Sequence, residues 1–214
     1  MNLTATFEAI YSQINGESIK LGDLRKIAKE IKTDHDLAME LWSTKEIMPR
    51  LLAILIMDKK VLSQNLIDRL DQDMQIHSYD EKTQLMDWLM ANKLTKDKNT
   101  LALITSWRSS PSPLQRRIFW YYQARLRWTG QNPPDNTSDL LSFIEVNMTN
   151  EEPEVQWAMN FTAAWIGVFD KDYRSRCIGI GEETGLYKDE IVARGCTPSY
   201  LPEFIKIEVN KRKN

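Results

Sequence analysis

The sequence predicts an all-α protein built from repeated pairs of helices. Apolar residues recur at helical spacing along most of the chain, and β-branched alternation never extends beyond a few residues. The most apolar of the predicted helices begin near residues 45, 81, 114 and 154. A unit that returns at intervals of roughly 33 to 40 residues is typical of helix-pair repeats.

The first clear helix is predicted at residues 21–32, LGDLRKIAKEIK. Its apolar residues fall at i, i+3, i+4 and i+7, namely Leu24, Ile27, Ala28 and Ile31. Asp23 near the start and basic residues towards the end suit the helix macrodipole.

Four further helices follow with short polar connections, at residues 36–42, 43–58, 62–74 and 80–92. Ser43 and Glu46 have the spacing of a capping box at the start of the second of these helices. The glycine-rich string GIGEETG at residues 179–185 is interpreted as a turn, because it lacks the flanking strand and the Lys-Ser/Thr ending of a phosphate loop.

One helix pair cannot bury its apolar side alone, so neighbouring pairs should stack. We therefore expect a single domain over residues 1–214, a right-handed α-solenoid of the HEAT-like or armadillo type with a concave cleft. Most leucine, isoleucine, methionine and tryptophan side chains should pack between helices, and the concave face is the expected place for function.

Composition narrows the class of protein further. The chain has 214 residues, of which 42% are hydrophobic and 27% charged, and it has no apolar run of the ~20 residues that a membrane helix needs. We expect a cytoplasmic monomer without membrane contact, with Cys177 and Cys196 as reduced core thiols. The two cysteines lie far in sequence from His35 and His77, so no metal site and no cofactor are expected.

Charge is unevenly distributed along the chain. The formal net charge is -2, yet residues 98–134 contain no Asp or Glu. The same stretch holds six basic residues, Lys98, Arg108, Arg116, Arg117, Arg125 and Arg127. Acidic residues flank it on both sides, so one repeat is cationic in sequence.

A helical projection of residues 114–128 separates two sides. One is apolar and should be core, with Leu114, Ile118, Phe119, Tyr122 and Leu126. The other carries Arg116, Trp120, Gln123 and Arg127. Guanidinium groups bind phosphate oxygens and aromatic rings lie against bases, so this second side is a candidate DNA contact; the alternative is a solvated basic face.

Several segments together resemble a known family. They are IKLGDLRKIAKEIKTDHDLAMELWSTKEIMPRLLAILIMD, QLMDWLMAN, the triplet Leu114-Gln115-Arg116, and PEVQWAMNFTAAWIGVF. In this order they resemble the bacterial HEAT-like repeat DNA alkylation repair proteins, the AlkD group of alkylpurine DNA glycosylases. The resemblance implies a C-shaped helical array that holds duplex DNA, alkylated DNA included, and excises N3- or N7-alkylated purines without a metal or redox cofactor.

The resemblance also implies roles for individual residues. Asp87 matches the catalytic aspartate, which would stabilise positive charge on the deoxyribose. Arg116 matches the DNA-contacting arginine. Thr83 and Phe161 stand where the family has tryptophans, and Trp88 is close to the first of these positions. The candidate DNA-binding set is thus Arg116, Trp88 and Phe161, with Trp120 and Arg127 from the helical projection and Arg117 from the cationic stretch.

The departures at Thr83 and Phe161, together with a short N-terminal region, imply a short subgroup of the family. We expect such a protein to bind duplex DNA in a basic cleft with weak or lost glycosylase activity. The alternative is a protein-interaction scaffold, because α-solenoids commonly bind other proteins on their concave face.

Overall fold

The computed structural model describes residues 4–15 and 19–212, and within these residues all regular secondary structure is helical. The chain divides into two compact units, Met1–Thr105 and Ser106–Asn214. A single domain over residues 1–214 stays a prediction. In the described ranges no helix has the length and apolar character needed to cross a membrane.

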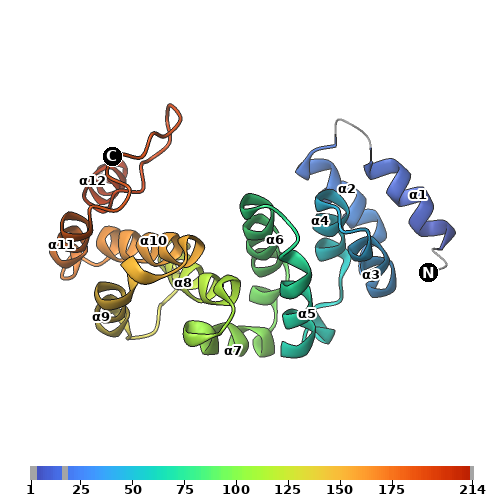
Figure 1. Cartoon of the computed structure of the whole chain (residues 1–214), viewed down its shortest axis with the longest axis horizontal. Helices are drawn as coiled ribbons and strands as arrows, with labels where there is room; N and C mark the ends of the chain where they lie inside the picture. Colours follow the sequence, from blue (N-terminus) through green and yellow to red (C-terminus); the bar gives the residue numbers. More distant parts are fainter. Residues whose placement is uncertain (1–3, 16–18, 213–214) are drawn as a thin grey trace. The chain divides into compact units, whose positions relative to one another are not determined.

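Unit 1 is a series of short helices joined by tight connections (Figure 1). Its helices are α1 (Ala5–Ile14), α2 (Leu21–Ile31), α3 (His35–Ser43), α4 (Ile47–Ile56), η1 (Lys59–Val61), α5 (Gln64–Met74), α6 (Tyr79–Asn92) and η2 (Leu94–Lys96), followed by α7 (Lys98–Ser106) at the boundary. Helix α4 is the centre of this unit, because α2, α3 and α6 all pack against it. Its run of apolar side chains is accordingly buried.

A buried arginine links three helices of unit 1. The side chain of Arg50, on α4, is 1% exposed and donates hydrogen bonds to the backbone carbonyls of Trp42 (3.2 Å) and Asp73 (2.6 Å). Its guanidinium lies 4.7 Å from the centroid of the Trp42 ring. Burial lowers the pKa of Arg50, and these partners stabilise the charge that remains inside.

Unit 2 contains the two longest described helices, α8 (Pro113–Trp128) and α10 (Pro153–Phe169), which pack against each other (Figure 1). Around them lie η3 (Trp107–Ser109), α9 (Thr137–Asn147), η4 (Met148–Asn150), α11 (Arg174–Thr184) and α12 (Leu201–Lys211). A proline occupies the first turn of α8 and of α10, where its missing N–H costs nothing, and Ser112 caps α8 by accepting the Gln115 N–H at 3.3 Å.

The predicted repeat is confirmed. Helices α4, α6, α8 and α10 begin at residues 47, 79, 113 and 153, so their spacings are 32, 34 and 40 residues. Each is preceded by a helix that packs on it or leads into it, which is the helix-pair pattern that the sequence indicates.

Three local predictions are wrong. Ser43 ends α3, where its hydroxyl donates to the Glu40 carbonyl, and Glu46 alone precedes α4. The string GIGEETG is not a turn, because residues 179–184 form the end of α11 and only Gly185, at φ 62°, is the left-handed cap. Cys196 is exposed rather than in the core, whereas Cys177 is buried and both thiols are free.

Candidate nucleic-acid interface

The expected catalytic residue, Asp87, lies on α6 in unit 1 and is partly buried. Thr83, one turn earlier, is only 8% exposed, and its hydroxyl donates to the backbone carbonyls of Tyr79 (2.9 Å) and Asp80 (3.0 Å). The hydroxyl is thus engaged by the helix itself. Thr83 therefore places no aromatic ring beside Asp87.

Trp88 has a structural role in unit 1. Its indole Nε1 donates to the Leu51 carbonyl of α4 at 3.1 Å, so the ring joins α6 to α4. The guanidinium of the exposed Arg25, on α2, lies 4.7 Å from the ring centroid. Arg25 therefore covers one face of the Trp88 ring, and the indole nitrogen is engaged by the backbone of α4.

Arg116, on α8 in unit 2, is held by two carboxylates. Its Nη2 lies 2.9 Å from Glu151 Oε2 and also donates to Glu152, both at the start of α10. Its Nη1 donates to the Ser110 carbonyl at 2.8 Å. The side chain expected to contact phosphate therefore joins α8 to α10 in this structure.

The helical projection is wrong for Trp120, Gln123 and Arg127. These residues are 0%, 2% and 5% exposed, because α10 and side chains of α9 cover the side of α8 that the projection left open. The Trp120 ring packs against Phe143 of α9, with 5.5 Å between centroids. A fully buried ring cannot meet a base or a sugar without unfolding its surroundings.

Arg127 donates its hydrogen bonds to uncharged groups nearby. Its guanidinium donates to the Gln123 carbonyl at 2.9 Å and to the Thr137 hydroxyl at 3.1 Å. Burial lowers its pKa, while the nearby carboxylate of Asp170 favours the charged form. It lines a cavity of about 600 Å³ that also holds Asp170 and Asp172, so the cavity does not favour an anion.

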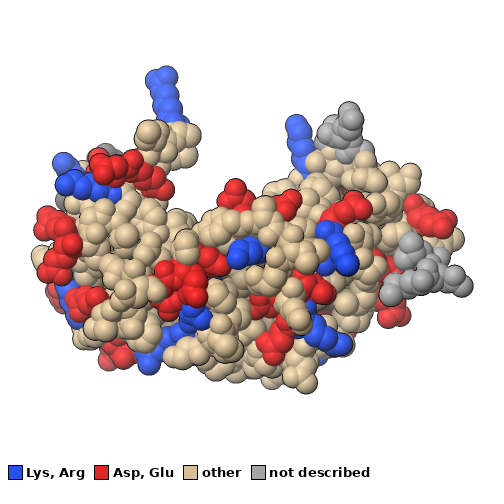
Figure 2. Space-filling model, in the orientation of Figure 1, with Lys and Arg blue, Asp and Glu red and all other residues tan. Residues whose placement is uncertain are grey.

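Four of the six basic side chains in the cationic stretch, those of Arg108, Arg116, Arg117 and Arg127, are engaged by other groups. Arg108 is paired with Asp139 of α9, and Arg117 is 6% exposed and donates to the Glu154 carbonyl at 3.1 Å. On the face drawn in Figure 2, basic and acidic side chains are interspersed. The acidic residues that follow the stretch in sequence fold back onto its arginines.

The most distinctive feature of unit 2 is a cluster of aromatic rings on α8 and α10. Phe161 is its centre: it stacks on Trp157 (4.8 Å between centroids, 16° between planes) and lies 5.7 Å from both Tyr121 and Trp128. These four rings are partly exposed. Behind them, the buried rings of Trp165 and Phe204 contact Phe161 at 5.9 and 6.0 Å.

Arginines lie at the border of this cluster. The Arg117 guanidinium is 4.7 Å from the centroid of Trp157, and that of Arg125 is 5.9 Å from Trp128. We call the four partly exposed rings, Tyr121, Trp128, Trp157 and Phe161, the aromatic surface. Sequence reasoning identified Phe161 but missed its neighbours, although Trp157, Phe161, Trp165 and Phe169 recur every four residues along one helix face.

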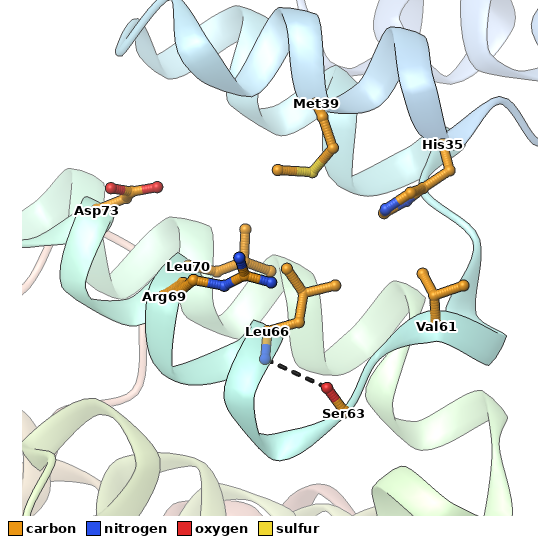
Figure 3. A pocket seen from close by; sticks show the side chains of 8 residues that line it. All are labelled: His35, Met39, Val61, Ser63, Leu66, Arg69, Leu70 and Asp73. Carbon is orange, nitrogen blue, oxygen red and sulfur yellow. Dashed lines mark hydrogen bonds between the residues drawn. The ribbon is translucent and has the colours of Figure 1, made fainter.

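Unit 1 has a separate cavity of about 530 Å³ between α3 and α5 (Figure 3). Met39 of α3 faces Leu66 and Leu70 of α5 across it. Its polar wall has one guanidinium, that of Arg69, and one carboxylate, that of Asp73. Asp73 also accepts a hydrogen bond from the Trp42 indole at 2.8 Å. Because one guanidinium and one carboxylate line the cavity together, it favours neither an anionic nor a cationic ligand.

The fold and this site define a helical-repeat protein with an arginine-bordered aromatic surface. A family model described as DNA alkylation repair enzyme matches residues 12–174, which is most of the chain. The protein belongs to the DNA alkylation repair family. No curated protein is similar enough to the chain to count as a match.

A solved structure has the same fold. It is described as "A new family of proteins related to the HEAT-like repeat DNA glycosylases with affinity for branched DNA structures". The similarity covers 98% of this chain and 89% of that chain, with a TM-score of 0.67 and 22% sequence identity. At this identity the likeness establishes the HEAT-like helical-repeat fold and nothing about ligands.

Proposed function

We propose that this protein binds DNA through the aromatic surface of unit 2, with a preference for branched or partly unpaired DNA over an intact duplex. The observation that carries the proposal is the stacked pair Trp157 and Phe161, 4.8 Å apart and partly exposed, with the Arg117 guanidinium beside it. Large aromatic rings are usually buried, so a group of partly exposed rings needs a reason.

Stacking of nucleic-acid bases on these rings would explain why they are partly exposed. Every base has a π face, and stacking on an aromatic side chain contributes about 1–3 kcal/mol per base. In an intact duplex these faces are covered by neighbouring base pairs, whereas at a junction or a single-stranded end they are open. Family membership and the affinity of the structural relative for branched DNA support the same conclusion.

The test compares a four-way junction with a linear duplex of the same sequence. Wild type should bind the junction more tightly, and Trp157→Leu should reduce junction affinity by about tenfold because one stacking platform is removed. Phe169→Leu is the matched control, since Phe169 is an exposed aromatic residue on the same helix outside the aromatic surface. Equal junction affinity of wild type and Trp157→Leu would contradict the proposal.

We propose further that alkylpurine excision is weak or lost. Asp87 is partly exposed, but Thr83 gives it no aromatic partner and Arg25 covers one face of Trp88. Incubation with methylated DNA should therefore release little 3- or 7-methylpurine. Release by wild type that Asp87→Asn abolishes would show an active glycosylase instead, and binding to neither junction nor duplex would favour the protein scaffold.

A further inference from the structure

Unit 1 contains a strongly basic cavity that does not coincide with the cationic stretch of sequence. It measures about 590 Å³ and lies where α4 and α6 end, between η1 and η2. Four lysines line it, Lys59 and Lys60 after α4 and Lys93 and Lys96 after α6. One carboxylate, that of Asp58, accompanies them.

Three of the four ammonium groups have no hydrogen bond or ion pair with any residue in the described part of the chain. Only Lys59 is engaged: its Nζ donates to the Lys96 carbonyl at 2.7 Å and so connects the two sides of the cavity. Asp58 forms no ion pair with the lysines, and its carboxylate accepts the backbone N–H of Lys60 at 2.9 Å. This differs from Arg108 and Arg116 of unit 2, which form ion pairs with carboxylates.

Lys93 shows the electrostatic cost of this arrangement. Its side chain is partly buried, and burial lowers the pKa of its ammonium group. The nearby ammonium of Lys59 lowers this pKa further, and only Asp58 opposes the shift. The folded state therefore holds a desolvated cation beside a second cation, an unfavourable contact that a bound anion would relieve.

The helix ends account for part of the cluster but not for all of it. A helix C-terminus carries partial negative charge and favours a cation nearby. Lys93 is the C-cap of α6, and Lys59 lies two residues beyond Met57, the C-cap of α4. One cation at each end meets that requirement. Lys60 and Lys96 add two further positive charges that the helix ends do not need.

We propose that this lysine cavity binds a phosphate group. Lysine is a common phosphate ligand as a point charge, and a phosphate dianion matches several unpaired ammonium groups better than a single carboxylate does. The Asn92 side chain adds a polar wall, although its amide already donates to the Trp88 carbonyl at 2.8 Å. The volume exceeds that of one phosphate, so a larger phosphorylated molecule also fits.

The phosphate has two possible sources, the backbone of DNA or a free phosphorylated compound. The first source rests on the proposed function, because the protein must then bind DNA. The second does not. Both share the same chemistry at the lysines, so the experiment uses one probe for each.

The experiment titrates the full chain with inorganic pyrophosphate by calorimetry, and with the junction DNA over a range of salt concentrations. The cavity variant is Lys60→Gln with Lys96→Gln. The control variant, Lys29→Gln with Lys206→Gln, removes the same charge from exposed lysines outside the cavity. Unchanged melting temperatures confirm that both variants are folded.

If the source is a free compound, pyrophosphate binds with one site per chain, and the affinity of the cavity variant falls at least about tenfold, a change of about 1.4 kcal/mol. If the source is DNA, the cavity variant weakens junction binding and reduces the slope of log K against log salt by about 2, since each substituted lysine leaves one phosphate without its counter-charge. In either case protons should be taken up on binding in alkaline solution, because the anion raises the pKa of Lys93.

Two results would overturn the inference. One is the absence of any pyrophosphate binding together with an unchanged salt slope in the cavity variant. The other is an equal effect of the cavity and control variants, which would show a response to net charge alone. Trp157→Leu separates this inference from the proposed function, since it should weaken junction binding and leave pyrophosphate binding intact.

Discussion

The guanidinium of Arg116 lies 2.9 Å from the carboxylate of Glu151, and the two side chains are 14% and 15% exposed. A partly buried ion pair of this kind holds its members more firmly than a surface pair does. The arginine that the family resemblance assigns to DNA contact is thus engaged within unit 2. Its availability to phosphate depends on the acidic residues at the start of α10.

Removing those acidic residues should strengthen DNA binding. The double variant Glu151→Gln with Glu152→Gln leaves Arg116 without its carboxylate partners, so the guanidinium can pair with a phosphate. We expect higher junction affinity and a salt slope steeper by about 1. The control is Glu182→Gln with Glu183→Gln, which removes the same charge from exposed positions in the same unit. If both pairs raise affinity equally, Arg116 is not the contact.

Gly181 should be required for the packing of α12. A Cβ built at Gly181 would lie 2.6 Å from Pro202 Cδ and 2.7 Å from Leu201 Cβ, so Gly181→Ala should destabilise the protein by about 1–3 kcal/mol through overpacking. Gly179, on the same helix, has nothing within 4 Å. Gly179→Ala should stabilise it by up to about 1 kcal/mol through helix propensity. Denaturant unfolding of both variants measures the difference, and a change of the same sign in both would refute the packing argument.

The two cysteines should differ in reactivity. Burial raises the pKa of Cys177 to about 12, so its thiolate is scarce and its sulfur is inaccessible. Cys196 is exposed. A maleimide reagent should label Cys196 quickly in the native protein and label Cys177 only after denaturation. Mass spectrometry of the labelled peptides checks this, and rapid labelling of native Cys177 would show that α11 opens readily.

The capping box at the start of α6 should make the stability of the protein depend on pH in the acidic range. Ser78 and Glu81 form a capping box, and the backbone N–H of Ser78 is the largest of the contacts that lower the pKa of Glu81. Because the folded pKa is lowered, this stabilisation is present above the usual glutamate range and is lost as pH falls through the folded pKa.

Two variants distinguish the contribution of the Ser78 N-cap to stability from that of the Glu81 charge. Ser78→Ala should cost about 1 kcal/mol at neutral pH because the N-cap is removed. Glu81→Gln should flatten the fall in melting temperature at acidic pH, since no carboxylate remains there to be protonated. An unchanged acid profile in Glu81→Gln would mean that other carboxylates set the acid stability.

The helical content and the repeat could be predicted from sequence because helix periodicity is a local property. The helix predicted at residues 21–32 is α2, and the apolar side predicted for residues 114–128 is buried apart from the partly exposed Tyr122. The projection failed for Trp120 and Arg127 because it assumes one buried side. Side chains of α9 contact Trp120 and Arg127 while α10 packs on α8, so a second side of α8 is buried too.

The sequence by itself determined the all-α fold, the repeat and the family, since these follow from patterns read along the chain. It did not determine which charges remain available, because ion pairing depends on residues brought together from distant positions. Arg108, Arg116 and Arg117 have partners that follow them in sequence, whereas Lys59, Lys60, Lys93 and Lys96 meet from two neighbouring repeats around one cavity. Only the tertiary structure decided that Lys60, Lys93 and Lys96 gather around one cavity without ion-pair partners among the described residues, because Coulomb interactions depend on distance in space and not on separation along the chain.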